Sequence, residues 1–113
     1  MELDMELMTK VKQLELSIKE LRKNGTAYAQ AEKDYKILLR QECLRLRDEG
    51  MAIGMIDKTC YGIASVAEAR FRRDICEATY KANQEAINAI KLEMRIIASQ
   101  LEREYDNTGK GNL

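Results

Sequence analysis

An unbroken helical pattern fills the second half of the sequence and restricts the chain to a helical architecture. Between Ser65 and Asp106 there is neither glycine nor proline. Apolar residues recur there at alternating steps of four and three, the spacing of a heptad repeat. This pattern predicts one long helix over 66–105, about 60 Å long at 1.5 Å per residue. Its inward positions, which we call the seam, are Cys76, Tyr80, Asn83, Ile87, Ile90, Met94, Ile97 and Leu101.

The first half of the sequence predicts two shorter helices. The first covers 3–23, and the pair Asn24-Gly25 is suited to a left-handed helix cap that ends it. The second covers 27–48, with Thr26 as its N-cap and Gly50 as its stop. Because the link between them is short, we expect these two helices to form an antiparallel hairpin.

The connector and the tail complete the predicted organisation. Gly54 and Gly62 flank a short helix over 54–61, and Ser65 with Glu68 forms a capping box for the long helix. Residues 106–113 are expected to be disordered. The predicted fold class is therefore all-α: a hairpin and a long C-terminal helix in a coiled-coil-like bundle, forming a single helical domain over 1–105.

The predicted helix lengths imply self-association. Two helices of about 30–35 Å cannot cover a seam of about 60 Å. The uncovered apolar side chains would then lie against a second copy of the chain. Asn83 is a polar seam residue of the kind that fixes register in a coiled coil. The expected homo-oligomer interface consists of Tyr80, Asn83, Ile87, Ile90, Met94, Ile97 and Leu101.

Charge and composition exclude several classes of function. The 19 basic and 19 acidic residues give a net charge of zero, so no basic face for nucleic acid is expected. No apolar run is long enough for a membrane span. The three cysteines include no CxxC pair and the chain has no histidine, so no metal site or cofactor is predicted. Reduced thiols are typical of a cytoplasmic protein.

Catalytic residues are not predicted. Without histidine, neither a Ser–His–Asp nor a Cys–His arrangement can form. No strand precedes a glycine-rich phosphate loop, because no strand is predicted. We therefore expect a protein that binds rather than an enzyme.

One cluster has an alternative interpretation as a ligand site. Arg70, Phe71, Arg72 and Arg73 lie together near the start of the long helix, and Tyr80 follows within two turns. Guanidinium groups bind phosphate and aromatic rings stack on bases, so two copies could enclose a nucleotide between subunits. The other interpretation is that these arginines form ordinary pairs on the helix surface with Glu68, Asp74 and Glu77.

Three runs within 27–105 carry a resemblance to known proteins, and they read AYAQAEKDYKILL, LRDEGM and ATYKANQEAINAIKLEMRIIASQLEREY. In these runs the chain resembles small helical proteins of phages and prophages of Gram-positive bacteria that are encoded among early genes near recombination functions. It implies an accessory protein in the cytoplasm of a bacterial host, an adaptor or inhibitor that binds a host or phage protein in defence, replication or recombination. The alternative is an anti-defence protein that sequesters a nucleotide signal.

Overall fold

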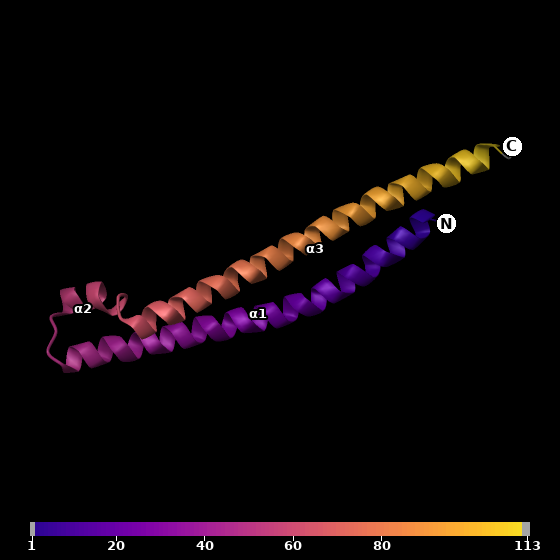
Figure 1. Cartoon of the computed structure of the whole chain (residues 1–113). Coiled ribbons are helices and arrows are strands. Elements are labelled where there is room, and N and C mark those ends of the chain that lie inside the picture. Colours follow the sequence, from indigo (N-terminus) through magenta and orange to yellow (C-terminus); the bar gives the residue numbers. More distant parts are fainter. Residues whose placement is uncertain (1, 112–113) are drawn as a thin grey trace. The chain divides into compact units, whose positions relative to one another are not determined.

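The computed structural model describes the backbone of residues 2–111 and the side chains of residues 2–107. It contains three helices: α1 over Glu2–Asp48, α2 over Ile53–Cys60 and α3 over Ala64–Gly111 (Figure 1). No strand occurs in the described part of the chain. The predicted all-α class and the long C-terminal helix are confirmed.

The chain forms two compact units, and both long helices contribute to each. Unit 1 contains Met1–Arg22 and Ala82–Leu113, and unit 2 contains Lys23–Lys81. Within unit 1, α1 and α3 run antiparallel, since Ser17 lies against Asn83 and Lys10 lies against Glu93. Unit 2 contains the rest of both helices together with α2. The single helical domain over 1–105 stays a prediction.

The predicted break between residues 23 and 27 is absent, because α1 continues through it. Among the described residues only Gly50 has a positive φ, at 87°, so Asn24 and Gly25 keep helical backbone. A Cβ atom on Gly25 would lie 3.1 Å from Cε2 of Tyr80. Glycine at this position therefore permits close packing against a ring on α3 rather than a turn. The antiparallel partner of α1 is consequently α3, and not a second half of α1.

The predicted stop of α1 at Gly50 is confirmed. The Gly50 N–H donates to the Arg47 carbonyl at 3.0 Å, and the Met51 N–H donates to the Leu46 carbonyl at 3.1 Å. This pair of bonds is the Schellman motif, which requires a left-handed residue between them. Met51 also packs on the buried cluster around Leu46, which fixes the direction in which the chain leaves α1.

The start and end of α3 differ from the prediction by a few residues. The Ile63 carbonyl accepts the N–H of Ala67 at 2.9 Å, so the helix begins at Ala64 and Ser65 lies in its first turn. The expected cap at Ser65 is therefore wrong. At the other end α3 continues past Tyr105 to Gly111, so 106–111 are helical rather than disordered. Residues 112 and 113 lie outside the described part.

The seam is covered by α1 of the same chain, which corrects the predicted interface. In unit 1, Ile87 and Ile97 are only 6% and 8% exposed. The Asn83 side-chain amide donates to the Ser17 carbonyl at 3.2 Å. The seam was expected to be exposed because two short helices could not cover its length. Helix α1 instead has 47 residues and is long enough to do so. The described seam residues of unit 1 that are buried or half-buried within the chain are Asn83, Ile87, Ile90, Met94, Ile97 and Leu101.

Replacing Ile97 with Ala should lower the free energy of unfolding by about 2–4 kcal/mol, because a buried side chain leaves a cavity against α1. Leu16, which is 61% exposed, is the matched control on α1. Leu16→Ala should change the stability by less than about 0.5 kcal/mol. Urea denaturation measures both values, and equal effects of the two changes would contradict the packing described for unit 1.

Two helical glycines should respond differently to replacement by Ala. A Cβ on Gly54 in α2 meets no atom within 4 Å, so Gly54→Ala should add about 0.5–1 kcal/mol of stability through helix propensity alone. Gly25→Ala should gain less or lose stability, because Tyr80 must shift. Thermal or urea unfolding tests this, and an equal gain at both positions would show that Gly25 is not held against the ring.

Candidate functional site

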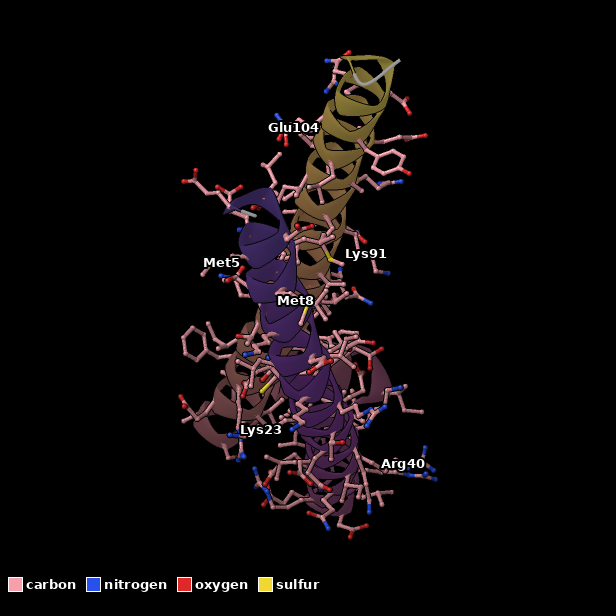
Figure 2. The ribbon with its side chains drawn as sticks, turned by 90° about the vertical axis from the view of Figure 1, so that its right-hand side faces the viewer. Met5, Met8, Lys23, Arg40, Lys91 and Glu104 are labelled. Atoms are coloured by element: carbon pink, nitrogen blue, oxygen red, sulfur yellow. The ribbon has the colours of Figure 1, made fainter. Side chains whose placement is uncertain are left out.

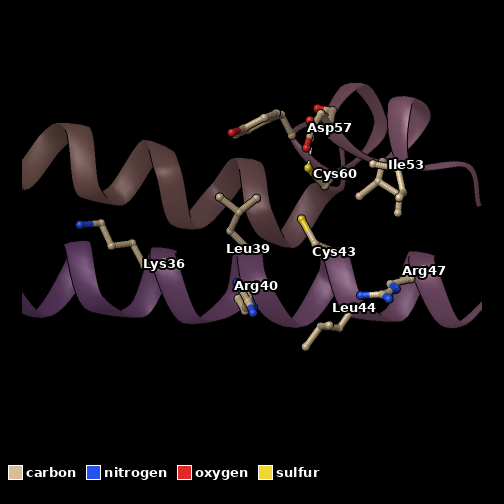
Figure 3. Close-up of a pocket in the computed structure, with 11 residues that line it drawn as sticks. Lys36, Leu39, Arg40, Cys43, Leu44, Arg47, Ile53, Asp57 and Cys60 are labelled. Carbon is tan, nitrogen blue, oxygen red and sulfur yellow. Dashed lines mark hydrogen bonds between the residues drawn. The ribbon is translucent and has the colours of Figure 1, made fainter.

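A groove in unit 2 lies between the C-terminal part of α1 and the short helix α2. It has a volume of about 530 Å³. On α1 the lining side chains recur at helical spacing and so share one side of the helix. Figure 3 shows Leu39 and Cys43 on the same side of α1, with Cys43 pointing towards Cys60 of α2. The lining residues are Lys36, Leu39, Arg40, Cys43, Leu44, Arg47, Ile53, Ile56, Asp57, Cys60 and Tyr61.

The apolar base of the groove rests on a buried cluster. Leu46, Ile56 and Cys60 are 4%, 7% and 1% exposed, and Leu39 and Cys43 pack against them. This cluster joins α1 to α2 and holds the groove in shape. At its edge the apolar surface meets solvent, since Ile53 is 79% exposed and Leu44 is 45% exposed. The groove thus combines a supported base with an apolar edge that no described residue covers.

Two thiols meet within the groove. The Cys60 thiol donates to the Asp57 carbonyl at 3.7 Å, and Cys43 packs against the buried cluster that contains Cys60. Burial raises the pKa of the Cys43 thiol, and the contact with Cys60 and the charge of Asp57 raise it further, against the opposing charge of Arg40. Since the thiolate is the nucleophile, Cys43 is held in its unreactive form at neutral pH.

The charge at the groove is positive. Arg40 and Arg47 are exposed, and neither forms an ion pair with a described residue. Figure 2 shows Arg40 extending away from α1. Arg45 on the same helix contrasts with them, because it bonds Glu42 at 2.7 Å and Glu49 at 2.8 Å. The single acid that lines the groove is Asp57. Two guanidinium groups are therefore available to an anionic group held beside the apolar base.

The arginine cluster of α3 is not gathered into one site within the chain. Residues 70–73 are consecutive on a helix, so their side chains leave it in different directions. Arg73 is half-buried, and its Nε donates to Asp74 Oδ1 at 2.8 Å and its Nη1 lies 3.4 Å from Glu32 Oε1. Its guanidinium also lies 4.8 Å from the centre of the Tyr35 ring. Arg73 thus joins α3 to α1. Its pair with Asp74 matches the pairing interpretation, whereas its contact with Glu32 on α1 was not expected.

The other members of that cluster lie apart from Arg73. Arg70 lies 5.8 Å from the centre of the Tyr61 ring, which is a cation–π distance. Phe71 is 60% exposed and Arg72 is also exposed.

Tyr80 packs on α1 and not beside the arginines. Its ring centre lies 6.0 Å from that of Tyr28, with an angle of 36° between the rings. Burial raises the pKa of Tyr28, and the charges of Glu77 and Glu32 add to this effect. Tyr80 therefore belongs to the packing of unit 2. It was predicted to lie at an interface between two copies of the chain, and its contact with Tyr28 of the same chain corrects that prediction.

The sequence reasoning missed the groove. Its cations, Lys36, Arg40 and Arg47, are four and seven residues apart, a spacing that places them on neighbouring positions of one helix. That pattern was visible in the sequence. What was not visible is that α2 folds back beside them, because nothing in the local pattern fixes the path of the connector.

Three further observations bear on the class of the protein. No helix in the described part of the chain has the length and hydropathy needed to span a membrane. Among the described residues, no three cysteine, aspartate or glutamate side chains are grouped so as to hold a metal ion. No protein family, curated protein or solved structure matches this chain.

Alkylation of Cys43 should be slow at neutral pH and should accelerate only above the ordinary thiol pKa of about 8.5, because its pKa is raised. Iodoacetamide labelling over a series of pH values, with each site resolved by mass spectrometry, measures the rate at Cys43. A midpoint at or below the ordinary value would contradict the buried thiol pair.

Proposed function

We propose that this chain is a non-enzymatic binding protein whose α1–α2 groove captures an acidic, amphipathic helix of a partner protein. The observation that carries the proposal is the pair of unpaired guanidinium groups, Arg40 and Arg47, beside an apolar groove of about 530 Å³. An apolar groove between helices is a common receptor for the apolar face of a third helix.

The dimensions of the groove support a helical ligand. From Lys36 to Arg47 its α1 side extends for about 16 Å at 1.5 Å per residue, or about three turns. A helix of three turns presents two or three apolar anchors at helical spacing. These match the apolar base at Leu39 and Ile56 and the apolar edge at Ile53. Apolar anchors supply most of the affinity in such complexes, and charged groups at the edge supply orientation and specificity.

The charges select an acidic ligand over a basic one. A carboxylate of the ligand next to its apolar anchors would contact Arg40 or Arg47. Neither guanidinium group would first have to break an ion pair within its own chain. A basic ligand would place like charges together and would find Asp57 as the only lining acid. The proposed partner therefore has glutamate or aspartate on both flanks of an apolar stripe.

The chemistry of the groove favours binding over catalysis. Its thiol Cys43 has a raised pKa, and the chain has no histidine to activate it. The resemblance to phage and prophage proteins supports a partner from the host or the phage, and an adaptor or inhibitor role in the bacterial cytoplasm. The nucleotide-sequestering alternative receives no support from Arg73, because Asp74, Glu32 and Tyr35 already occupy its guanidinium.

The proposal is tested by selecting helical peptides from a random display library on the immobilised protein. Selected peptides should be enriched in acidic and large apolar residues at helical spacing. Binding measured by fluorescence anisotropy should weaken at least about tenfold in the double variant Arg40→Glu, Arg47→Glu, since contacts to charged groups contribute about 1.5–3 kcal/mol.

Lys33→Glu is the matched control, since Lys33 is exposed on α1 but does not line the groove. It should leave the affinity within about twofold, as expected for a surface change away from the contact. Selected peptides without acidic enrichment, or equal losses in the control and the double variant, would overturn the proposal.

A further inference from the structure

Unit 1 contains a second groove, which lies between its two helices. We call it the α1–α3 groove. It has a volume of about 520 Å³, and all of its lining residues belong to unit 1. On each helix the outermost lining residues are seven positions apart, so each wall extends for about 10 Å, or about two turns. The lining residues are Leu7 and Leu14 on α1, and Lys91, Met94, Arg95 and Ala98 on α3.

The apolar floor of the α1–α3 groove is only partly covered. In unit 2 a third helix, α2, packs on α1 over a buried apolar cluster. The described part of unit 1 contains no third helix. Leu7, Leu14 and Met94 are half-buried there, and Ala98 is exposed. Their apolar surface is of the kind that the apolar face of a third helix buries.

The α3 wall of the groove is positively charged. Lys91 and Arg95 are exposed, and neither forms an ion pair with a described residue. Glu93 lies between them in the sequence, but it pairs with Lys10 of α1. The described residues that line the groove include no acid. Two cations on one wall are therefore available to a ligand.

We propose that the α1–α3 groove binds an amphipathic helix of a partner protein that carries acidic residues on one flank of its apolar face. The apolar face would pack on Leu7, Leu14 and Met94. Carboxylates on one flank would contact Lys91 and Arg95, and such charge pairs fix the orientation of a ligand. The other flank would lie beside α1, whose lining residues are both leucines, so it needs no charge.

Charge complementarity favours this occupant over a second copy of the chain. Two copies docked groove on groove would enclose the Lys91 and Arg95 side chains of both chains, and the lining residues would supply no acid to balance them. Like charges brought together in an interface weaken binding. An acidic helix supplies the missing carboxylates without this repulsion.

The inference is independent of the α1–α2 groove, because it uses residues of unit 1 alone. The two ligands also differ in charge pattern. Acids are expected on both flanks of the helix bound by the α1–α2 groove, and on one flank of the helix bound here. A chain with both receptors would join two partners, which is the activity of an adaptor.

The experiment uses the full chain with the α1–α2 groove disabled by Arg40→Glu and Arg47→Glu. Helical peptides are selected on this immobilised variant from a random display library. Selected peptides should carry large apolar residues at helical spacing and glutamate or aspartate on one flank. Their affinities for the native chain and for the disabled variant should agree within about twofold in fluorescence anisotropy, because the α1–α3 groove is intact in both.

Two sets of changes in the α1–α3 groove should remove this binding. In the same background, Lys91→Glu together with Arg95→Glu should weaken it at least about tenfold, because like charges then meet. Ala98→Glu should weaken it by a similar factor, because it places a charge against the apolar face of the ligand. Unchanged helicity in circular dichroism would show that these variants remain folded, as expected for exposed positions.

Lys12→Glu together with Lys19→Glu is the matched control, since both lysines are exposed on α1 of unit 1 and neither lines the groove. It should leave the affinity within about twofold. No enriched peptide, peptides without acidic residues, or equal losses in the control would each overturn the proposal. A native mass of twice 13.0 kDa in light scattering that Ala98→Glu reduces to one chain would assign the groove to a second copy, and would overturn it as well.

Discussion

The close approach of Tyr80 to Gly25 is the contact on which the arrangement of the chain depends. It lets the backbone of α1 continue as a helix where the local sequence would allow it to end. Because α1 continues, a single helix of 47 residues is available to α3, and the apolar residues of unit 1 are buried without a second chain. A Cβ atom at position 25 would lie 3.1 Å from Cε2 of Tyr80, so the ring would have to shift.

The groove between α1 and α2 depends on a second glycine, Gly50. Gly50 takes the left-handed conformation that ends α1, and the chain then returns along α1 as α2. This return buries Leu46, Ile56 and Cys60 and forms the apolar base between the helices. Arg40 and Arg47 keep their charges exposed, whereas Arg45 on the same helix is bonded to Glu42 and Glu49. The left-handed conformation of Gly50 and the distribution of ion pairs on α1 together give an apolar groove with a positive charge beside it.

Helical periodicity predicted the seam of α3, the short helix after Gly50 and the end of α1, because each depends on neighbours in the sequence. The prediction failed at Asn24-Gly25, since an asparagine–glycine pair fits a helix cap and glycine also fits a close contact with a distant ring. Only Tyr80, far along the chain, decides between them. That single error led to the wrong interface. Arg40 and Arg47 form no ion pair with a described residue. This depends on side-chain rotamers and on which acids pair with which bases, and a sequence pattern does not determine either.

The buried residues are divided unequally between the two units. Unit 2 contains Ala31, Tyr35, Leu46, Ile56, Cys60 and Val66, whereas unit 1 contains Ile87 and Ile97. Local opening requires less free energy where fewer apolar contacts are lost. The ends of α1 and α3 in unit 1 should therefore separate transiently while unit 2 stays folded. A protease that reaches these opened helix ends could shorten the chain and leave the groove intact.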